Sequence, residues 1–121
     1  MKLVSRAYYI GTGIDGQPTL YRAQLGRNPT PDREELVQGI EDMRLMFAED
    51  TDNNGVPDMY RYPNSVSNWN NVIGVRLGVL ARTPSTTPGS DGSTYDLAGI
   101  SVPKTDNYRR HAFNTVVQFR N

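Results

Sequence analysis

The sequence is poor in the residues that most often carry protein chemistry. It contains no cysteine, one histidine and one tryptophan among 121 residues. The lack of cysteine excludes a disulfide framework, a thiol nucleophile and thiolate ligands for zinc. The single histidine, His111, follows Arg109 and Arg110, and no motif supplies the nucleophile or orienting acid that a catalytic histidine needs. We therefore expect that this protein is not an enzyme.

Strong net charge and long apolar runs are also absent. Thirteen basic residues balance thirteen acidic ones, so the composition gives no reason to expect a nucleic-acid partner. The sequence contains no run of about 18 apolar residues, so it predicts no membrane span. The first six residues are too short and too polar for a secretion signal, and strand-like sequence already begins at Leu3. This start favours a chain trimmed of an upstream anchor.

Strand-like sequence makes up most of the chain. Alternating or β-branched residues predict strands over 3–10, 19–25, 72–81 and 108–120. Segment 32–49 fits a helix and a strand equally well, because Asp32 and Glu35 resemble a capping box whereas Met43, Leu45 and Phe47 alternate. Segment 83–107 is rich in proline, serine, threonine and glycine, which predicts a long irregular loop. The predicted fold is a single mainly β domain, residues 1–121, with an antiparallel sheet of about five strands.

Three glycines, Gly11, Gly13 and Gly16, match the G-x-G-x-x-G pattern of dinucleotide-binding loops. That motif requires a helix directly after it, whereas Pro18 is followed here by another strand-like stretch. We interpret the glycines as a hairpin loop.

The most distinctive stretch is the acidic segment 50–58. Counted as an EF-hand loop, it offers oxygen ligands at positions one, three, five, seven and nine, and these are Asp50, Asp52, Asn54, the carbonyl of Val56, and Asp58. Position twelve is Arg61 instead of the bidentate glutamate, so another segment would have to complete the site, with Glu49, Asp91, Asp96 and Asp106 as candidates. A structural Ca²⁺ site and an empty turn both stay open, because Asp, Asn and Gly also favour turns.

Aromatic residues follow the acidic segment. Two interpretations of these residues are open, namely that they form a surface that binds a partner or a sugar, or that they pack on the core; the residues are Trp69, Tyr60 and Tyr62. The binding interpretation belongs to an alternative function, a secreted calcium-dependent module that recognises a glycan or a cell surface.

The order of several motifs resembles a known family. The motifs are Tyr8-Tyr9-Ile10-Gly11, Leu20-Tyr21-Arg22, the stretch 35–43, the stretch 69–76 that begins with Trp69-Asn70-Asn71, and an ending with Arg109-Arg110, Phe113, Thr115-Val116-Val117 and Arg120-Asn121. In this order they resemble the C-terminal part of PilW-type minor pilins of type IV pili, over nearly all of the chain except segment 83–107. The resemblance implies an α+β pilin-like full protein, in which an antiparallel sheet packs on an N-terminal helix. It also implies a strand over 40–49.

The resemblance further implies a structural role in assembly. The partners it implies are other minor pilins and the major pilin, in a complex that initiates the pilus or forms its tip. The location it implies is the extracellular pilus or the periplasmic face of the inner membrane, which such a subunit reaches only through its N-terminal helix. Minor pseudopilins of type II secretion are a related alternative.

Overall fold

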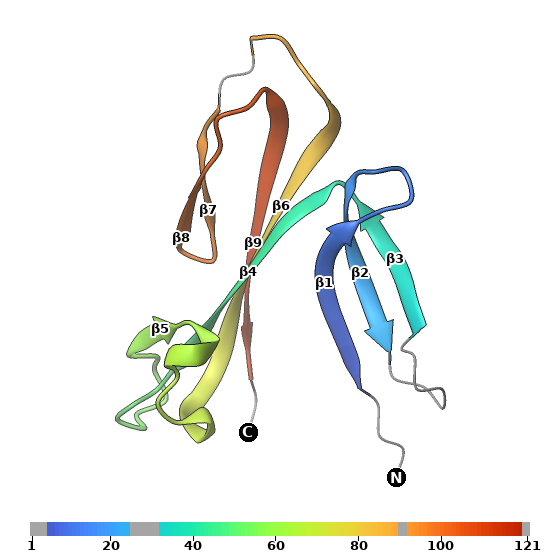
Figure 1. Ribbon diagram of the computed structural model, residues 1–121. Coiled ribbons are helices and arrows are strands. Elements are labelled where there is room, and N and C mark those ends of the chain that lie inside the picture. Colours follow the sequence, from blue (N-terminus) through green and yellow to red (C-terminus); the bar gives the residue numbers. More distant parts are fainter. Residues whose placement is uncertain (1–4, 25–31, 90–91, 120–121) are drawn as a thin grey trace.

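The computed structural model describes residues 5–24, 32–89 and 92–119 (Figure 1). These residues form nine strands and two short 3-10 helices, with no α-helix among them. None of the described helices is long and apolar enough to span a membrane. The strands are β1 (Arg6–Thr12), β2 (Pro18–Gln24), β3 (Asp32–Gln38), β4 (Ile40–Glu49), β5 (Met59–Arg61), β6 (Val72–Thr86), β7 (Thr94–Leu97), β8 (Ile100–Pro103) and β9 (Tyr108–Gln118), and the helices are η1 (Pro63–Ser65) and η2 (Trp69–Asn71). The predicted mainly β, antiparallel class is confirmed.

The strands form three antiparallel sheets. One sheet has the order β1-β2-β3, a second has the order β5-β4-β6-β9, and β7 and β8 form a two-stranded hairpin. In Figure 1 the four-stranded sheet runs through the middle, with the β7–β8 hairpin on its left and the three-stranded sheet on its right. The four-stranded sheet is therefore the framework on which the other two are placed.

The glycine-rich segment 11–17 connects β1 to β2 as a hairpin. Gly13 donates its N–H to the carbonyl of Gln17, and Gly16 donates to the carbonyl of Gly13. β2 then pairs with β1 along its whole length. The interpretation as a hairpin loop is confirmed, and no helix follows the glycines.

Residues 32–49 form two strands and no helix. They meet at Gly39, whose φ of +84° lies in the left-handed region that favours glycine. Gly39 donates its N–H to the carbonyl of Pro18 and accepts from the N–H of Arg82, which ties the three-stranded sheet to β6. The strand over 40–49 that the family resemblance implied is confirmed.

The prediction of an irregular loop over 83–107 is wrong in part. β6 continues to Thr86, and β7 and β8 lie inside this segment, joined by a tight turn at Ala98 and Gly99. Both turn residues have positive φ, 55° and 86°, as a two-residue hairpin requires. This segment is rich in turn-forming residues, so its composition did not indicate the two strands, which have only four residues each. These strands matter because the side chains of Leu97 and Val102 pack on Leu80 of β6 and form the buried core with it.

The two faces of the four-stranded sheet differ in what covers them. Side chains alternate between faces along a strand, so the register assigns each residue to one face. The β7–β8 hairpin covers Gly78 and Leu80 on one face, which we call the hairpin face. The opposite face, which we call the apolar face, carries Met43, Leu45 and Phe47 of β4, Val75, Leu77 and Val79 of β6, and Phe113 and Val117 of β9. None of these eight residues is buried.

Candidate functional site

The acidic turn follows directly from the end of β4. The carboxylates of Asp50, Asp52 and Asp58 each offer an oxygen atom within 4.8 Å of the others. Asp50 is 2% exposed, whereas Asp52 and Asp58 are exposed. Positive φ angles at Asn53 (61°) and Gly55 (87°) curl the backbone around the cluster. The structure therefore brings together the three acidic residues that the sequence singled out.

Backbone amides and the remaining side chains of the turn hold these carboxylates in place. Asp50 accepts hydrogen bonds from the N–H groups of Asn54 (3.1 Å) and Gly55 (2.7 Å). Asp58 accepts from the N–H (2.7 Å) and the hydroxyl (2.8 Å) of Thr51. The side-chain amide of Asn54 donates to Asp52 (3.2 Å) and accepts from the N–H of Val56 (2.9 Å). Asn54 and Val56 thus lie in the same turn as the carboxylates.

The electrostatics of the cluster differ from one carboxylate to the next. Burial, a hydrogen bond to Asp50 and the charge of Asp58 all raise the pKa of Asp52. The hydrogen bond from the Thr51 hydroxyl lowers the pKa of Asp58. A divalent cation among the three oxygens would oppose the repulsion that Asp52 experiences. Of the other acidic residues considered as ligands, Glu49, Asp96 and Asp106 do not join the cluster, and Asp91 lies outside the described residues.

Glu49, the last residue of β4, has a structural task of its own. It is fully buried and accepts hydrogen bonds from the N–H (2.9 Å) and hydroxyl (2.6 Å) of Ser67 and from the N–H of Asn68 (2.9 Å). Arg61 places its Nε 2.7 Å from the same carboxylate. The Ser67 hydrogen bond is the main reason why the pKa of Glu49 is lowered. Glu49 therefore anchors the segment that carries Trp69, a role that no spacing in the sequence indicated.

The three aromatic residues do not form one surface. The Trp69 ring packs edge-on against Phe47 of the apolar face, with 5.0 Å between ring centroids. The ring of Tyr60 lies beneath the guanidinium of Arg76, 3.7 Å from the ring centroid, and the sheet register places Tyr60 on the hairpin face. Tyr62 is 47% exposed. Trp69 and Tyr60 therefore lie on opposite faces of the four-stranded sheet.

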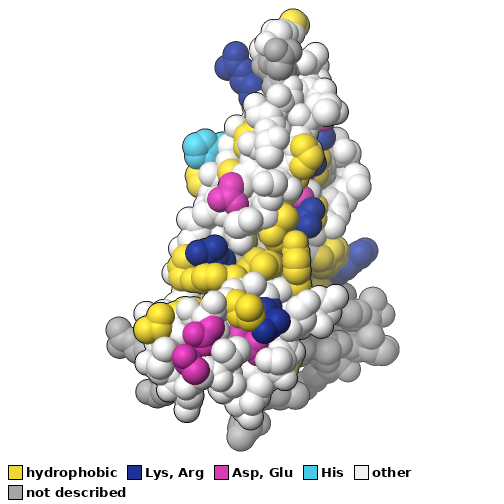
Figure 2. Space-filling model, turned by 90° about the vertical axis from the view of Figure 1, so that its left-hand side faces the viewer, with side chains coloured by type: hydrophobic (Ala, Val, Ile, Leu, Met, Phe, Trp, Pro, Cys, Tyr) yellow, Lys and Arg dark blue, Asp and Glu magenta, His cyan; other side chains and the backbone are white. Residues whose placement is uncertain are grey.

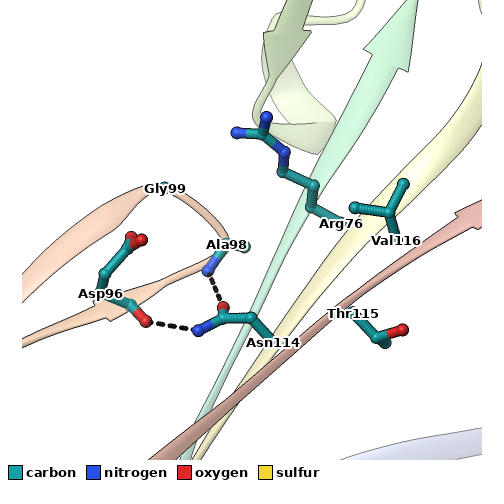
Figure 3. Close-up of a pocket in the computed structure, with 7 residues that line it drawn as sticks. All are labelled: Arg76, Asp96, Ala98, Gly99, Asn114, Thr115 and Val116. Atoms are coloured by element: carbon teal, nitrogen blue, oxygen red, sulfur yellow. Dashed lines mark hydrogen bonds between the residues drawn. The ribbon is translucent and has the colours of Figure 1, made fainter.

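A pocket of 290 Å³ opens on the hairpin face, between the turn of the β7–β8 hairpin and β9 (Figure 3). Asn114 of β9 holds that turn, because its Oδ1 accepts from the N–H of Ala98 (2.7 Å) and its Nδ2 donates to the carbonyl of Asp96 (2.8 Å). Arg76 projects into the pocket from β6, and Val116 borders it on β9. The sequence had not singled out Arg76, Asn114 or this pocket as a site.

A cluster of charges ties the other end of β9 to β4. The Arg110 side chain is 1% exposed, contacts Glu41 through its Nε, and binds Asp106 at 2.5 Å. Lys104 and Arg82 also lie 3.6 Å from Glu41. The hydrogen bond with Arg110 lowers the pKa of Asp106 to about 2. The neighbouring His111 packs its ring on Phe113, with centroids 4.5 Å apart. This cluster fixes the position of β9 against β4 and β6.

Comparisons with known proteins give one match. A family model described as type IV pilus-assembly protein W matches residues 7–121. No curated protein and no solved structure matches the chain. The matched range includes the acidic turn, the apolar face and the β7–β8 hairpin.

Proposed function

The chain belongs to the PilW family of type IV pilus-assembly proteins, and on that premise we propose that it is a minor pilin subunit that acts in pilus initiation or at the pilus tip. Its partners are then other minor pilins and the major pilin, at the periplasmic face of the inner membrane or on the extracellular pilus. The observation that supports this proposal best is the partly exposed apolar face of the four-stranded sheet.

The apolar face is only partly covered, because three of its eight residues are exposed and five are partly buried. It presents eight large apolar side chains, among them Leu45 (38% exposed), Phe113 (57%) and Val117 (47%), while the hydrophobic core lies on the hairpin face. Trp69 extends this face at its edge and is 55% exposed. Fully burying one such side chain is worth about 1.5–3 kcal/mol, so a partner that covers the face gains substantially. Large exposed apolar patches mark interaction sites.

We propose an apolar helix as the occupant of this face, because the family resemblance implies a sheet packed on an N-terminal helix. A helix presents a continuous apolar stripe, and the alternating residues of three neighbouring strands present a broad surface to receive it. Docking on this helix would place the subunit among the pilins that share the same architecture.

The test replaces Leu77, at the centre of the apolar face, by aspartate in a strain whose pili depend on this protein. We expect Leu77→Asp to reduce the number of surface pili, because a charge at the centre of the contact opposes helix docking. The matched control is Ile14→Asp in the β1–β2 loop, where Ile14 is 95% exposed and lies outside the apolar face. Immunoblots would show equal amounts of both variants. Normal piliation with Leu77→Asp would contradict the proposal.

We also propose that the acidic turn binds Ca²⁺ and that the ion has a structural role. Ca²⁺ takes six to eight oxygen ligands, and the converging carboxylates of Asp50, Asp52 and Asp58 supply the first of them, with carbonyls and water for the remainder. The candidate ligands Asn54 and Val56 lie in the same turn. A bound ion would fix the connection between β4 and β5 and make stability depend on external calcium.

The calcium proposal is tested by thermal unfolding with Ca²⁺ and with a chelator. Ca²⁺ at one hundred times its Kd adds about 2.7 kcal/mol to the free energy of unfolding. For a chain of this length that corresponds to a rise in Tm of roughly 10 °C. Asp52→Asn should abolish the rise, while Asp96→Asn, which removes a carboxylate outside the cluster, should keep it. A midpoint that does not respond to Ca²⁺ would show that the segment is only a turn.

A further inference from the structure

We propose that the open edge of β9 and the pocket beside it bind an extended segment of another protein, which adds a strand to the sheet and places a carboxylate on Arg76. The identification of that protein as a neighbouring pilus subunit rests on the proposed function. The site itself rests on the geometry of β9, Arg76 and the β7–β8 hairpin.

The outer edge of β9 is available for pairing. Among the described strands, β9 pairs only with β6. Phe119 donates its N–H to the carbonyl of Ile73, so the odd-numbered residues of β9 direct their backbone groups toward β6. The N–H and C=O groups of Asn114, Val116 and Gln118 therefore point to the open side. No proline, lysine or bulge interrupts residues 112–118, and such interruptions are the usual protection of an edge strand.

Arg76 supplies a charge that is held in place and has no partner among the described residues. Five other arginines of the described chain form an ion pair with a carboxylate, whereas Arg76, like Arg6, Arg33 and Arg109, forms none among the described residues; the five are Arg22, Arg44, Arg61, Arg82 and Arg110. Arg76 instead rests on the ring of Tyr60, at 3.7 Å from the centroid, and projects into the pocket, which Asp96 also lines without forming an ion pair with Arg76. Figure 3 shows its guanidinium extending toward the turn at Gly99. A guanidinium fixed in this way can donate two parallel hydrogen bonds to a carboxylate.

An apolar cavity adjoins the charged pocket along the same strand. It has a volume of 210 Å³, and its lining includes Ala48, Tyr60, Ile73, Gly74 and Val116. Val116, which is 60% exposed, borders both cavities. Figure 2 shows a band of hydrophobic side chains across the molecule on the side where the β7–β8 hairpin lies. A segment with a carboxylate and an apolar side chain two residues away would direct both side chains to this face, roughly 7 Å apart.

Pairing with the β9 edge of a second copy fits the site poorly. β9 contains arginines and a histidine but no acidic residue, so pairing of two β9 edges would leave both Arg76 side chains without a carboxylate. β3 is also an edge strand and is acidic, but Glu34 binds Arg22 at 2.6 Å and Glu35 accepts from the hydroxyl of Tyr21 at 3.0 Å. Asp32 of β3 forms no ion pair among the described residues, so charge argues against pairing of two β9 edges only, and a segment of a different protein is the occupant that we propose.

The test uses the 121-residue chain and a peptide of sequence TVTETVT with blocked ends, in which the glutamate lies two residues from each valine. Binding is followed by amide NMR and hydrogen exchange. We expect the peptide to slow exchange at Asn114, Val116 and Gln118, which the edge leaves unprotected. Val116→Pro should abolish this effect, because it removes one outward N–H and leaves the pairing with β6 intact, and Val116→Thr serves as its control.

A double-mutant cycle tests the role of Arg76. Arg76→Gln should weaken binding of the TVTETVT peptide by about tenfold or more, since charge-assisted hydrogen bonds are roughly twice as strong as neutral ones. The same substitution should leave binding of the TVTQTVT peptide nearly unchanged. An equal effect on both peptides would refute the contact between Arg76 and the carboxylate.

Two further results would overturn the proposal. One is the absence of protection along β9 at about 1 mM TVTETVT peptide, a concentration that detects even weak binding. The other is a dimer, seen by sedimentation, that protects the same amides and thereby assigns the edge to a second copy. Because these measurements use the isolated chain, their failure leaves the helix proposal for the apolar face intact. A null result with Leu77→Asp likewise leaves the β9 site intact.

Discussion

Gly78→Ala tests whether the β7–β8 hairpin is seated where the structure places it. Gly78 lies in the middle of β6, and a Cβ built on it would lie 2.5 Å from the backbone N of Ala98 and 2.6 Å from the Cα of Leu97. Ordinary contacts of a Cβ are about 1 Å longer. Because both neighbours are backbone atoms, the hairpin itself would have to move away.

The sign of the effect separates two explanations. If only strand propensity mattered, replacing a glycine inside a strand by alanine would stabilise the protein by about 0.5–1 kcal/mol. The clash predicts the opposite, since overpacking a close contact costs about 1–3 kcal/mol. Moving the turn also weakens its two hydrogen bonds with Asn114, each worth about 1 kcal/mol. We expect a net loss of about 2–4 kcal/mol, which lowers Tm by roughly 8–16 °C in a chain of this length.

The assay is equilibrium unfolding in urea together with amide NMR of the hairpin. The matched control is Gly11→Ala in β1, where the atoms nearest to the new Cβ belong to the side chains of Tyr21, at 3.1 Å, and Tyr9, at 3.5 Å. These rings can shift by a few tenths of an ångström, so the control should stay within about 1 kcal/mol of the parent. A Gly78→Ala protein as stable as the parent would refute the seating of the hairpin on β6.

Three further predictions concern charged residues. Arg110 lowers the pKa of Asp106 from 3.8 to about 2, so the stability that Asp106 contributes is complete above about pH 4 and is lost as the pH falls through about 2. Asp106→Asn should therefore flatten the dependence of Tm on pH between these values. An unchanged dependence would exclude the pair of Arg110 and Asp106 as its cause. Arg110→Met removes the closest cation from Glu41 and should cost about 1.5–3 kcal/mol in denaturant unfolding, because a charge-assisted hydrogen bond is lost while Arg82 and Lys104 still lie 3.6 Å from Glu41. A cost under about 1 kcal/mol would contradict the buried pair. Glu49→Gln should release the segment around Ser67 and shift the fluorescence of the only tryptophan to longer wavelength, whereas an unchanged spectrum would show that Glu49 does not order that segment.

The sequence by itself determined the features that depend on neighbours along the chain. Alternation predicted the strands that became β1, β2, β6 and β9, because a strand with two different faces must alternate its side chains. The glycines and Pro18 predicted the hairpin between β1 and β2, since both residue types act on the local backbone. The carboxylates of the acidic turn converge because all of them lie within nine residues.

Only the tertiary structure decided the features that depend on contacts between distant segments. Segment 32–49 fitted a helix or a strand locally, and its pairing with β2 and β6 selected the strands. Glu49 binds Ser67, which lies 18 residues away, and Arg110 binds Glu41, which lies 69 residues away, and residue patterns carry no signal over such distances. Alternation also could not show which side of β6 the β7–β8 hairpin covers. That choice rests on the space left by Gly78 and on the packing of Leu97 against Leu80, and it leaves the apolar face without the hairpin.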